Sequence, residues 1–203
     1  MRRAFIALSL TLAAAPALVV AQMPGSANAK LITAGTYEVD PAHTQVTWQV
    51  NHMGFSMLQG QFGASGGSIT VDPAKPAASK VEVTFAMDKL SVTSEQFATH
   101  LKGKDFFDVA TFPTAKFVST SVKPGANNTA TITGNLTIKD ITKPVTLQAR
   151  LIGAGANPMN KQMNFGFHAT GKVKRSDFGA GMAAPVVSDE VDLVINAAFV
   201  KKS

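Results

Sequence analysis

Four histidines are the side chains of this 203-residue chain best suited to bind a metal or to transfer protons near neutral pH. They are His43, His52, His100 and His168. No two of them have the i, i+4 spacing of a helical zinc site or lie close together along one expected strand. Cysteine is absent, which excludes thiolate ligands, thiolate nucleophiles and disulfides. We therefore expect no metal site and interpret the histidines as hydrogen-bonding residues.

The hydroxyl and carboxylate side chains do not form the pattern of an enzyme. The sequence has no G-x-S-x-G elbow, and the order of its Asp, His and Ser residues gives no recognisable triad. Arg175, Ser176 and Asp177 precede Phe178, where the charges either form a structural ion pair or face the polar head of a ligand. We predict a protein without catalytic activity; a His-dependent hydrolase or metalloenzyme is the less favoured alternative.

Alternation of apolar and polar residues predicts the strands that position these side chains. Val46, Trp48 and Val50 share one face of a strand over 44–50, and a glycine-rich turn is expected at 65–68. About eight such strands predict an all-β fold, either a barrel or a sandwich. The other main apolar rows are Val81, Val83, Phe85 and Met87; Ile132, Leu136 and Ile138; Val145, Leu147, Ala149 and Leu151; Met163, Phe165, Phe167 and Ala169; and Val191, Leu193, Ile195, Ala197 and Phe199.

One segment departs from the strand pattern and predicts a short helix over about 94–102. Thr93 and Gln96 have the spacing of a capping box, Phe97 and Leu101 lie four residues apart, and Gly103 is placed to end the helix. Aromatic residues are dense just beyond it, at Phe106, Phe107, Phe112 and Phe117. The helix and this corner are expected to cover one opening of the β body.

The N-terminal segment predicts export. Arg2 and Arg3 are followed by an apolar run and a small-residue site at Ala21, the pattern of a signal peptide over 1–21, with Ala29 as a second possible cleavage point. We expect a linker over 22–34 and one domain over 35–203. The net charge of +6 is spread along the chain, which argues against nucleic-acid binding and leaves weak attraction to an anionic membrane surface, or a homodimer, open.

A set of collinear motifs resembles the YceI-like family of exported lipid-binding proteins. The resemblance implies a lipocalin-like antiparallel β-barrel in the bacterial periplasm, whose cavity holds a long apolar molecule, typically a polyisoprenoid. No other cofactor is implied. The motifs are residues 37–44 (YEVDPAHT), 50–56 (VNHMGFS), 60–62 (GQF), 100–102 (HLK), 105–108 (DFFD), 112–113 (FP), 134–138 (GNLTI), 143–145 (KPV) and 174–179 (KRSDFG).

The predicted function is therefore that of a lipid carrier, and the alternative is a filled β-sandwich that binds a partner and has no lipid cavity. In that alternative the same apolar rows would interdigitate in a solid core. Methionines such as Met53 and Met57 suit a cavity that adapts to a flexible tail. The predicted ligand-binding residues are Trp48, His52, Phe55, Phe62, Phe85, Met87, Phe97, Leu101, Phe106, Phe107, Phe117, Phe167, Arg175 and Phe178.

Overall fold

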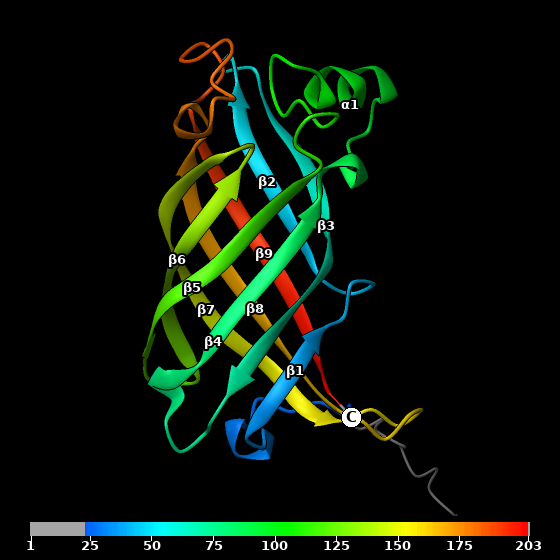
Figure 1. The fold of residues 1–203 in the computed structure, drawn as a ribbon, viewed down its shortest axis with the longest axis vertical. Helices are drawn as coiled ribbons and strands as arrows, with labels where there is room; N and C mark the ends of the chain where they lie inside the picture. The colour runs from blue at the N-terminus through cyan, green and yellow to red at the C-terminus, as the bar shows by residue number, and fades with distance from the viewer. Residues whose placement is uncertain (1–22, 203) are drawn as a thin grey trace, which may run out of the picture.

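The computed structural model describes residues 23–202, so the predicted signal peptide over 1–21 lies outside the described residues. Antiparallel strands dominate these residues and form a tall barrel (Figure 1). The strands are β1 Gly35–Val39, β2 Gln45–His52, β3 Ser56–Val71, β4 Lys80–Ala86, β5 Thr114–Pro124, β6 Thr129–Ile138, β7 Ile141–Ala156, β8 Met163–Lys174 and β9 Glu190–Lys201.

The barrel closes because β3 pairs with β4 on one side and with β2 on the other, and β2 pairs with β9. Strands β2 to β9 thus form a ring of eight. The short β1 is an extra strand that lies beside the far end of β3 and the end of β9, filling the space that β2 is too short to cover. The prediction of an antiparallel barrel of about eight strands is confirmed.

Irregularities in the long strands let the sheet curl. A bulge separates Ala64 from Gly66 on β3, and another separates Leu151 from Gly153 on β7. The turn predicted at 65–68 is wrong, because these residues continue β3 against β4. Gly67 has a φ of +136°, and a Cβ atom there would lie 2.2 Å from the carbonyl oxygen of Glu82, so the close strand contact requires glycine.

One α-helix, α1 Glu95–Lys102, lies at the upper end of the barrel as Figure 1 is drawn. The predicted helix is confirmed, but its N-cap is Ser94 rather than Thr93: the Ser94 hydroxyl accepts a hydrogen bond from the Phe97 amide. Gly103 follows the last turn as predicted. Within the described part of the chain, every helix is too short or too polar to cross a bilayer.

Short 3₁₀ helices complete the connections. They are η1 Ala29–Leu31, η2 Pro76–Ala78, η3 Met87–Lys89 and η4 Arg175–Phe178. Of these, η1 lies at the lower end of the barrel in Figure 1. It belongs to the segment predicted as a linker over 22–34, which packs against the barrel: Ser26 pairs with Ala154 of β7, and the Asn128 side chain donates a hydrogen bond to the carbonyl oxygen of Ala27.

Candidate functional site

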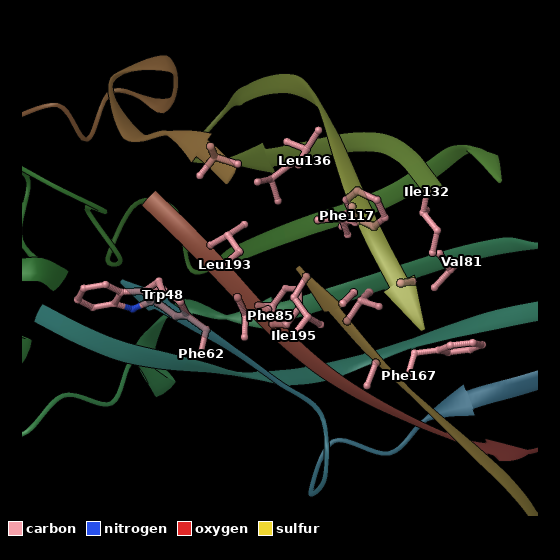
Figure 2. Close-up of a pocket in the computed structure, with 18 of the residues that line it drawn as sticks. Trp48, Phe62, Val81, Phe85, Phe117, Ile132, Leu136, Phe167, Leu193 and Ile195 are labelled. Atoms are coloured by element: carbon pink, nitrogen blue, oxygen red, sulfur yellow. The ribbon is translucent and has the colours of Figure 1, made fainter. Parts of the chain in front are cut away.

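The interior of the barrel is a cavity of about 900 Å³. Ligand pockets commonly have volumes of roughly 300–1,000 Å³, so this cavity is large enough for a sizeable molecule. Figure 2 shows its lining residues, with Trp48 and Phe62 toward one end and Phe167 toward the other. The interior is therefore an elongated space between the strands rather than a filled core.

The alternating rows seen in the sequence supply most of this lining. Val46, Trp48 and Val50 of β2 line the cavity, as do Val83 and Phe85 of β4, because alternate side chains on a strand point to the same face. The other predicted rows, on β6, β7, β8 and β9, also contribute. The residues between them point outward. The wall is thus hydrocarbon almost throughout, which favours an apolar ligand.

At the upper end the helix α1 and the corner after it cover the opening. Leu101 is buried, and the Phe107 amide donates a hydrogen bond to the Leu101 carbonyl oxygen, which folds the corner back under the helix. The Phe107 ring meets the Phe62 ring edge to face, with centroids 5.3 Å apart. Phe97 and Phe106 line the cavity from the same segment. These contacts join the cover to the barrel wall.

Trp48 is the single tryptophan of the chain, and it lines the cavity near the upper end. Its ring lies over Gly60 of the neighbouring strand, where a Cβ atom would lie 2.3 Å from the indole. The indole nitrogen is buried and has no hydrogen-bond partner among the described residues. The indole is thus a fixed part of the wall and a fluorescent reporter of the cavity.

Arg175 holds the loop that closes the upper end beside α1. Its Nε donates to the Ser188 carbonyl oxygen at 2.9 Å, and its Nη2 donates to that of Val187 at 2.8 Å. Its Nη1 donates to the carbonyl oxygens of Ala180 and Met182 at 2.7 and 2.6 Å. Four of the five N–H groups of a guanidinium are thereby used. Arg175 therefore acts mainly as a clamp on this loop, although it also lines the cavity.

Charge and hydrogen bonding around this clamp shift two pKa values. Burial lowers the pKa of the Arg175 guanidinium, against the opposing effect of Asp189. Hydrogen bonds from the hydroxyl and then the amide of Ser176, together with the charge of Arg175, hold the pKa of Asp189 below its ordinary value. The sequence pointed to a possible ion pair within residues 175–177. The described residues show no such ion pair: the guanidinium binds loop carbonyls, and Asp189, twelve residues beyond Asp177, acts on it only through its charge.

The four histidines lie apart from one another. His43 Nδ1 lies 2.6 Å from Asp40 Oδ2 in the exposed β1–β2 connection, and His168 bonds to Asn196 across the outer wall. His52 and His100 line the cavity, and the His100 ring meets Phe106. Among residues 23–202, no three His, Asp or Glu side chains are grouped so that they could hold a metal ion.

All but one of the residues predicted to contact a ligand line this cavity. The exception is Phe55, whose side chain is 84% exposed in the β2–β3 turn and does not line the cavity. Whether the others contact a ligand stays a prediction. The lining set is Trp48, His52, Phe62, Phe85, Met87, Phe97, Leu101, Phe106, Phe107, Phe117, Phe167, Arg175 and Phe178.

The lining of the lower end was not predicted from the sequence. Lys30 and Ile32 reach the cavity from the N-terminal segment, and Asp72, Pro76 and Asn128 reach it from the strand connections. A linker and two turns carry no periodic pattern, so only the folded chain brings them together. The one local signal was Asn28, a residue type favoured at a helix N-cap, which caps η1.

Comparison with known proteins gives consistent matches over most of the chain. A family model described as a YceI-like domain matches residues 37–199. A UPF0312 protein of Enterobacter sp. strain 638 is 40% identical over 171 residues, which cover 83% of this chain and 88% of that protein.

Solved structures show the same architecture. The crystal structure of Burkholderia cenocepacia BcnA is 28% identical and superposes with a TM-score of 0.68, covering 79% of this chain and 98% of that one. A polyisoprenoid binding domain from Saccharophagus degradans, implicated in plant cell wall breakdown, is only 10% identical and superposes with a TM-score of 0.59, covering 82% of this chain and 98% of that one. The second match shows a shared fold.

Proposed function

Because this chain belongs to the YceI-like family, we propose that it is a periplasmic carrier that holds a long amphipathic lipid, such as a polyisoprenoid, inside its barrel and does not catalyse a reaction. The observation that carries this proposal is the cavity of about 900 Å³ with its hydrocarbon wall. The filled β-sandwich considered as an alternative does not fit a closed barrel with this interior. The polyisoprenoid binding domain of Saccharophagus degradans, which shares the fold, supports the ligand class.

Burial of the tail supplies the binding energy in this proposal. Each CH₂ group removed from water contributes about 0.8 kcal/mol. A few isoprene units therefore exceed the free energy lost when the ligand and its rotamers are immobilised. Strong polar contacts are not needed for affinity, which agrees with a wall that offers few of them.

The head group lies near the upper end in this proposal, beside His52. That side chain lines the cavity and makes no hydrogen bond within residues 23–202, so both ring nitrogens are free to pair with a ligand. Arg175, considered at first for the same role, has four of its five N–H groups bound to loop carbonyls. His43 is bound to Asp40 outside the cavity.

Native mass spectrometry of the purified protein, before and after solvent extraction, tests the proposal. We expect an extractable apolar mass, and uptake of an added long-chain polyprenol by the extracted protein. A single apo mass together with no uptake of polyprenol or of a fatty amide contradicts it.

A substitution pair on β7 places the ligand within the barrel. Ala149→Trp fills the cavity from its wall, whereas Gln148→Trp puts the same side chain on the exposed outer face of the same strand. We expect the first to weaken polyprenol binding at least about tenfold, and the second to change it less than about twofold. Ala169→Trp on β8 repeats the test from a second wall position, should Ala149→Trp fail to fold. Equal affinities for folded inner and outer variants would contradict binding inside the barrel.

A further inference from the structure

Large apolar side chains are exposed on two neighbouring loops at the upper end. Phe55 is 84% and Val186 is 61% exposed, and Met53, Met57 and Met182 are each close to half exposed. We call these five residues the apolar rim. Met53 and Phe55 lie in the β2–β3 turn, and Met57 lies at the start of β3. The other two lie in the segment over 181–187. Fully exposed phenylalanine is costly in water, so a contiguous set of such residues marks an interaction surface.

Backbone contacts hold the two loops side by side. His52 forms a β-bridge with Val187. The Ser188 amide donates to the Asn51 carbonyl oxygen at 2.9 Å, and the Asn51 amide donates to the Ser188 hydroxyl at 3.0 Å. The apolar rim is therefore one surface and not two separate tips.

The backbone at the tip of the turn is constrained. Met53 and Gly54 have φ values of 60° and 74°, and the Phe55 amide donates to the His52 carbonyl oxygen, which makes a tight hairpin turn. A bulky side chain such as methionine is uncommon at positive φ. The Asn51 side chain supports the turn by accepting a hydrogen bond from the Gly54 amide. Met53 and Phe55 are thus presented outward on a rigid support.

The rim loops carry no formal charge. The chain has no Lys, Arg, Asp or Glu between Asp40 and Asp72, nor between Asp177 and Asp189. A surface that binds a charged protein or an anionic head group through ion pairs would carry such residues. A surface that enters a bilayer excludes them, because transfer of a charge into hydrocarbon is costly.

The apolar rim is also continuous with the cavity. His52 and Val187, which join the two loops, line the cavity, and so does Met182, although it is 46% exposed. A lipid tail that leaves the bilayer at the rim can therefore reach the cavity wall without crossing water. This continuity is what selects a lipid surface over other apolar partners.

We propose that the apolar rim inserts into the surface of a lipid bilayer, and that the ligand passes between bilayer and cavity at this point. The proposal rests on the proposed lipid-carrier function. Its driving force is burial of apolar area, so the contact does not require anionic lipid. It assigns the membrane contact to the end of the barrel opposite η1, and it gives Phe55 a role outside the cavity.

Transfer of a polyprenol from phosphatidylcholine vesicles to the extracted protein tests this proposal. The double variant Phe55→Ser/Val186→Ser should take up the polyprenol from vesicles at least about tenfold more slowly than the wild type. Its affinity for the same polyprenol added from ethanol, followed by Trp48 fluorescence, should stay within about twofold. Met159→Ser is the matched control, since Met159 is 92% exposed in the β7–β8 turn and should be silent in both assays.

Three outcomes would overturn the proposal. If the double variant transferred polyprenol at the wild-type rate and took it up normally from ethanol, insertion of the rim into the bilayer would be rejected. The proposed carrier function would not be affected by that result. An equal loss in Met159→Ser would reject the assignment to the upper end. A dimer in sedimentation experiments that the double variant abolishes would assign the rim to a second copy of the chain. Absence of uptake from ethanol in the wild type would instead reject the carrier function itself.

Discussion

The two ends of the barrel are closed by different means and expose different side chains on their loops. The upper end is covered by α1 and by the loop that Arg175 clamps, and it exposes the uncharged apolar rim. The lower end is covered by the N-terminal segment with η1. Several lysines lie in the segments at that end: Lys202 pairs with Glu38, and five others make no ion pair within residues 23–202. They are Lys30, Lys75, Lys80, Lys123 and Lys161.

This difference makes the two ends of the cavity chemically distinct. The uncharged apolar rim is stable against hydrocarbon, whereas unpaired lysines prefer to stay hydrated. The segments that cover the two ends are also held in place by different interactions. The upper loop depends on one partly buried cation and its carbonyl partners, whereas the lower cover depends on close backbone packing. Substitutions can therefore disturb each end separately.

Loss of the Arg175 clamp should have the largest effect on the free energy of unfolding. Arg175→Met keeps the length of the side chain but leaves four loop carbonyls without their donor. We expect the free energy of unfolding to fall by about 3 kcal/mol. For a domain of this size the melting temperature should fall by roughly 6–12 °C.

Arg150→Met is the matched control for the clamp, because Arg150 is exposed on the outer wall of β7. Its effect on the free energy of unfolding should stay within about 0.5 kcal/mol. Urea denaturation of the two variants makes the comparison. Similar losses in both would show that the clamp does not distinguish the upper end.

Displacing the N-terminal segment from the lower end should lower the free energy of unfolding by less than loss of the Arg175 clamp does. A Cβ atom at Gly155 would lie 2.3 Å from the Pro24 carbonyl oxygen, so Gly155→Val should push the N-terminal segment away from β7. We expect a loss of about 1–2 kcal/mol, from the broken Ser26–Ala154 pairing and its packing.

Hydrogen exchange at the Ser26 and Ala154 amides measures this opening directly, since each donates to the other's carbonyl oxygen. Gly63→Val is the control, because no atom lies within 4 Å of a Cβ built there. Unchanged protection at Ser26 in Gly155→Val would mean that the segment does not depend on this close contact.

Loss of the Asp189 carboxylate should have the smallest effect on stability, and this effect should appear as a change in how stability depends on pH. The pKa of Asp189 is lowered in the folded chain from an ordinary value of 3.8. Its stabilisation is therefore present above that value and is lost as the pH falls through the lowered folded-state pKa. Asp189→Asn and Ser176→Ala should both flatten the fall in stability below about pH 4, with little change near neutral pH. Thermal unfolding at a series of pH values checks this, and an unchanged acid limb in both variants would contradict it.

The strand rows and the helix were predictable because they depend on local periodicity. Val81, Val83 and Phe85 alternate, and alternate residues of a strand share a face whatever its partners are. The family was predictable from collinear motifs, and the family model confirms it. The turn at 65–68 was predicted wrongly because glycine marks both turns and bulges, and only the pairing with β4 separates the two.

The partners of individual polar and exposed residues could not be predicted in the same way. For Arg175 the sequence left two roles open, a structural ion pair or contact with a ligand head, but its guanidinium binds carbonyls that a distant loop brings to it. Phe55 was grouped with the lining aromatics, yet its turn points it into solvent. For Phe55, residue type alone cannot distinguish the two positions, because the inner wall of the barrel and the exposed rim use the same apolar residue types.

The sequence by itself determined the all-β class, the inner rows, the helix and its end at Gly103, and the absence of thiol chemistry. These follow from side-chain alternation, capping and composition, which act over a few residues. Tertiary structure alone decided that the rows enclose a space and do not meet in a solid core. Closure of β3 on β4 and of β2 on β9 fixes the number of strands around the barrel, and that number sets the width of its interior.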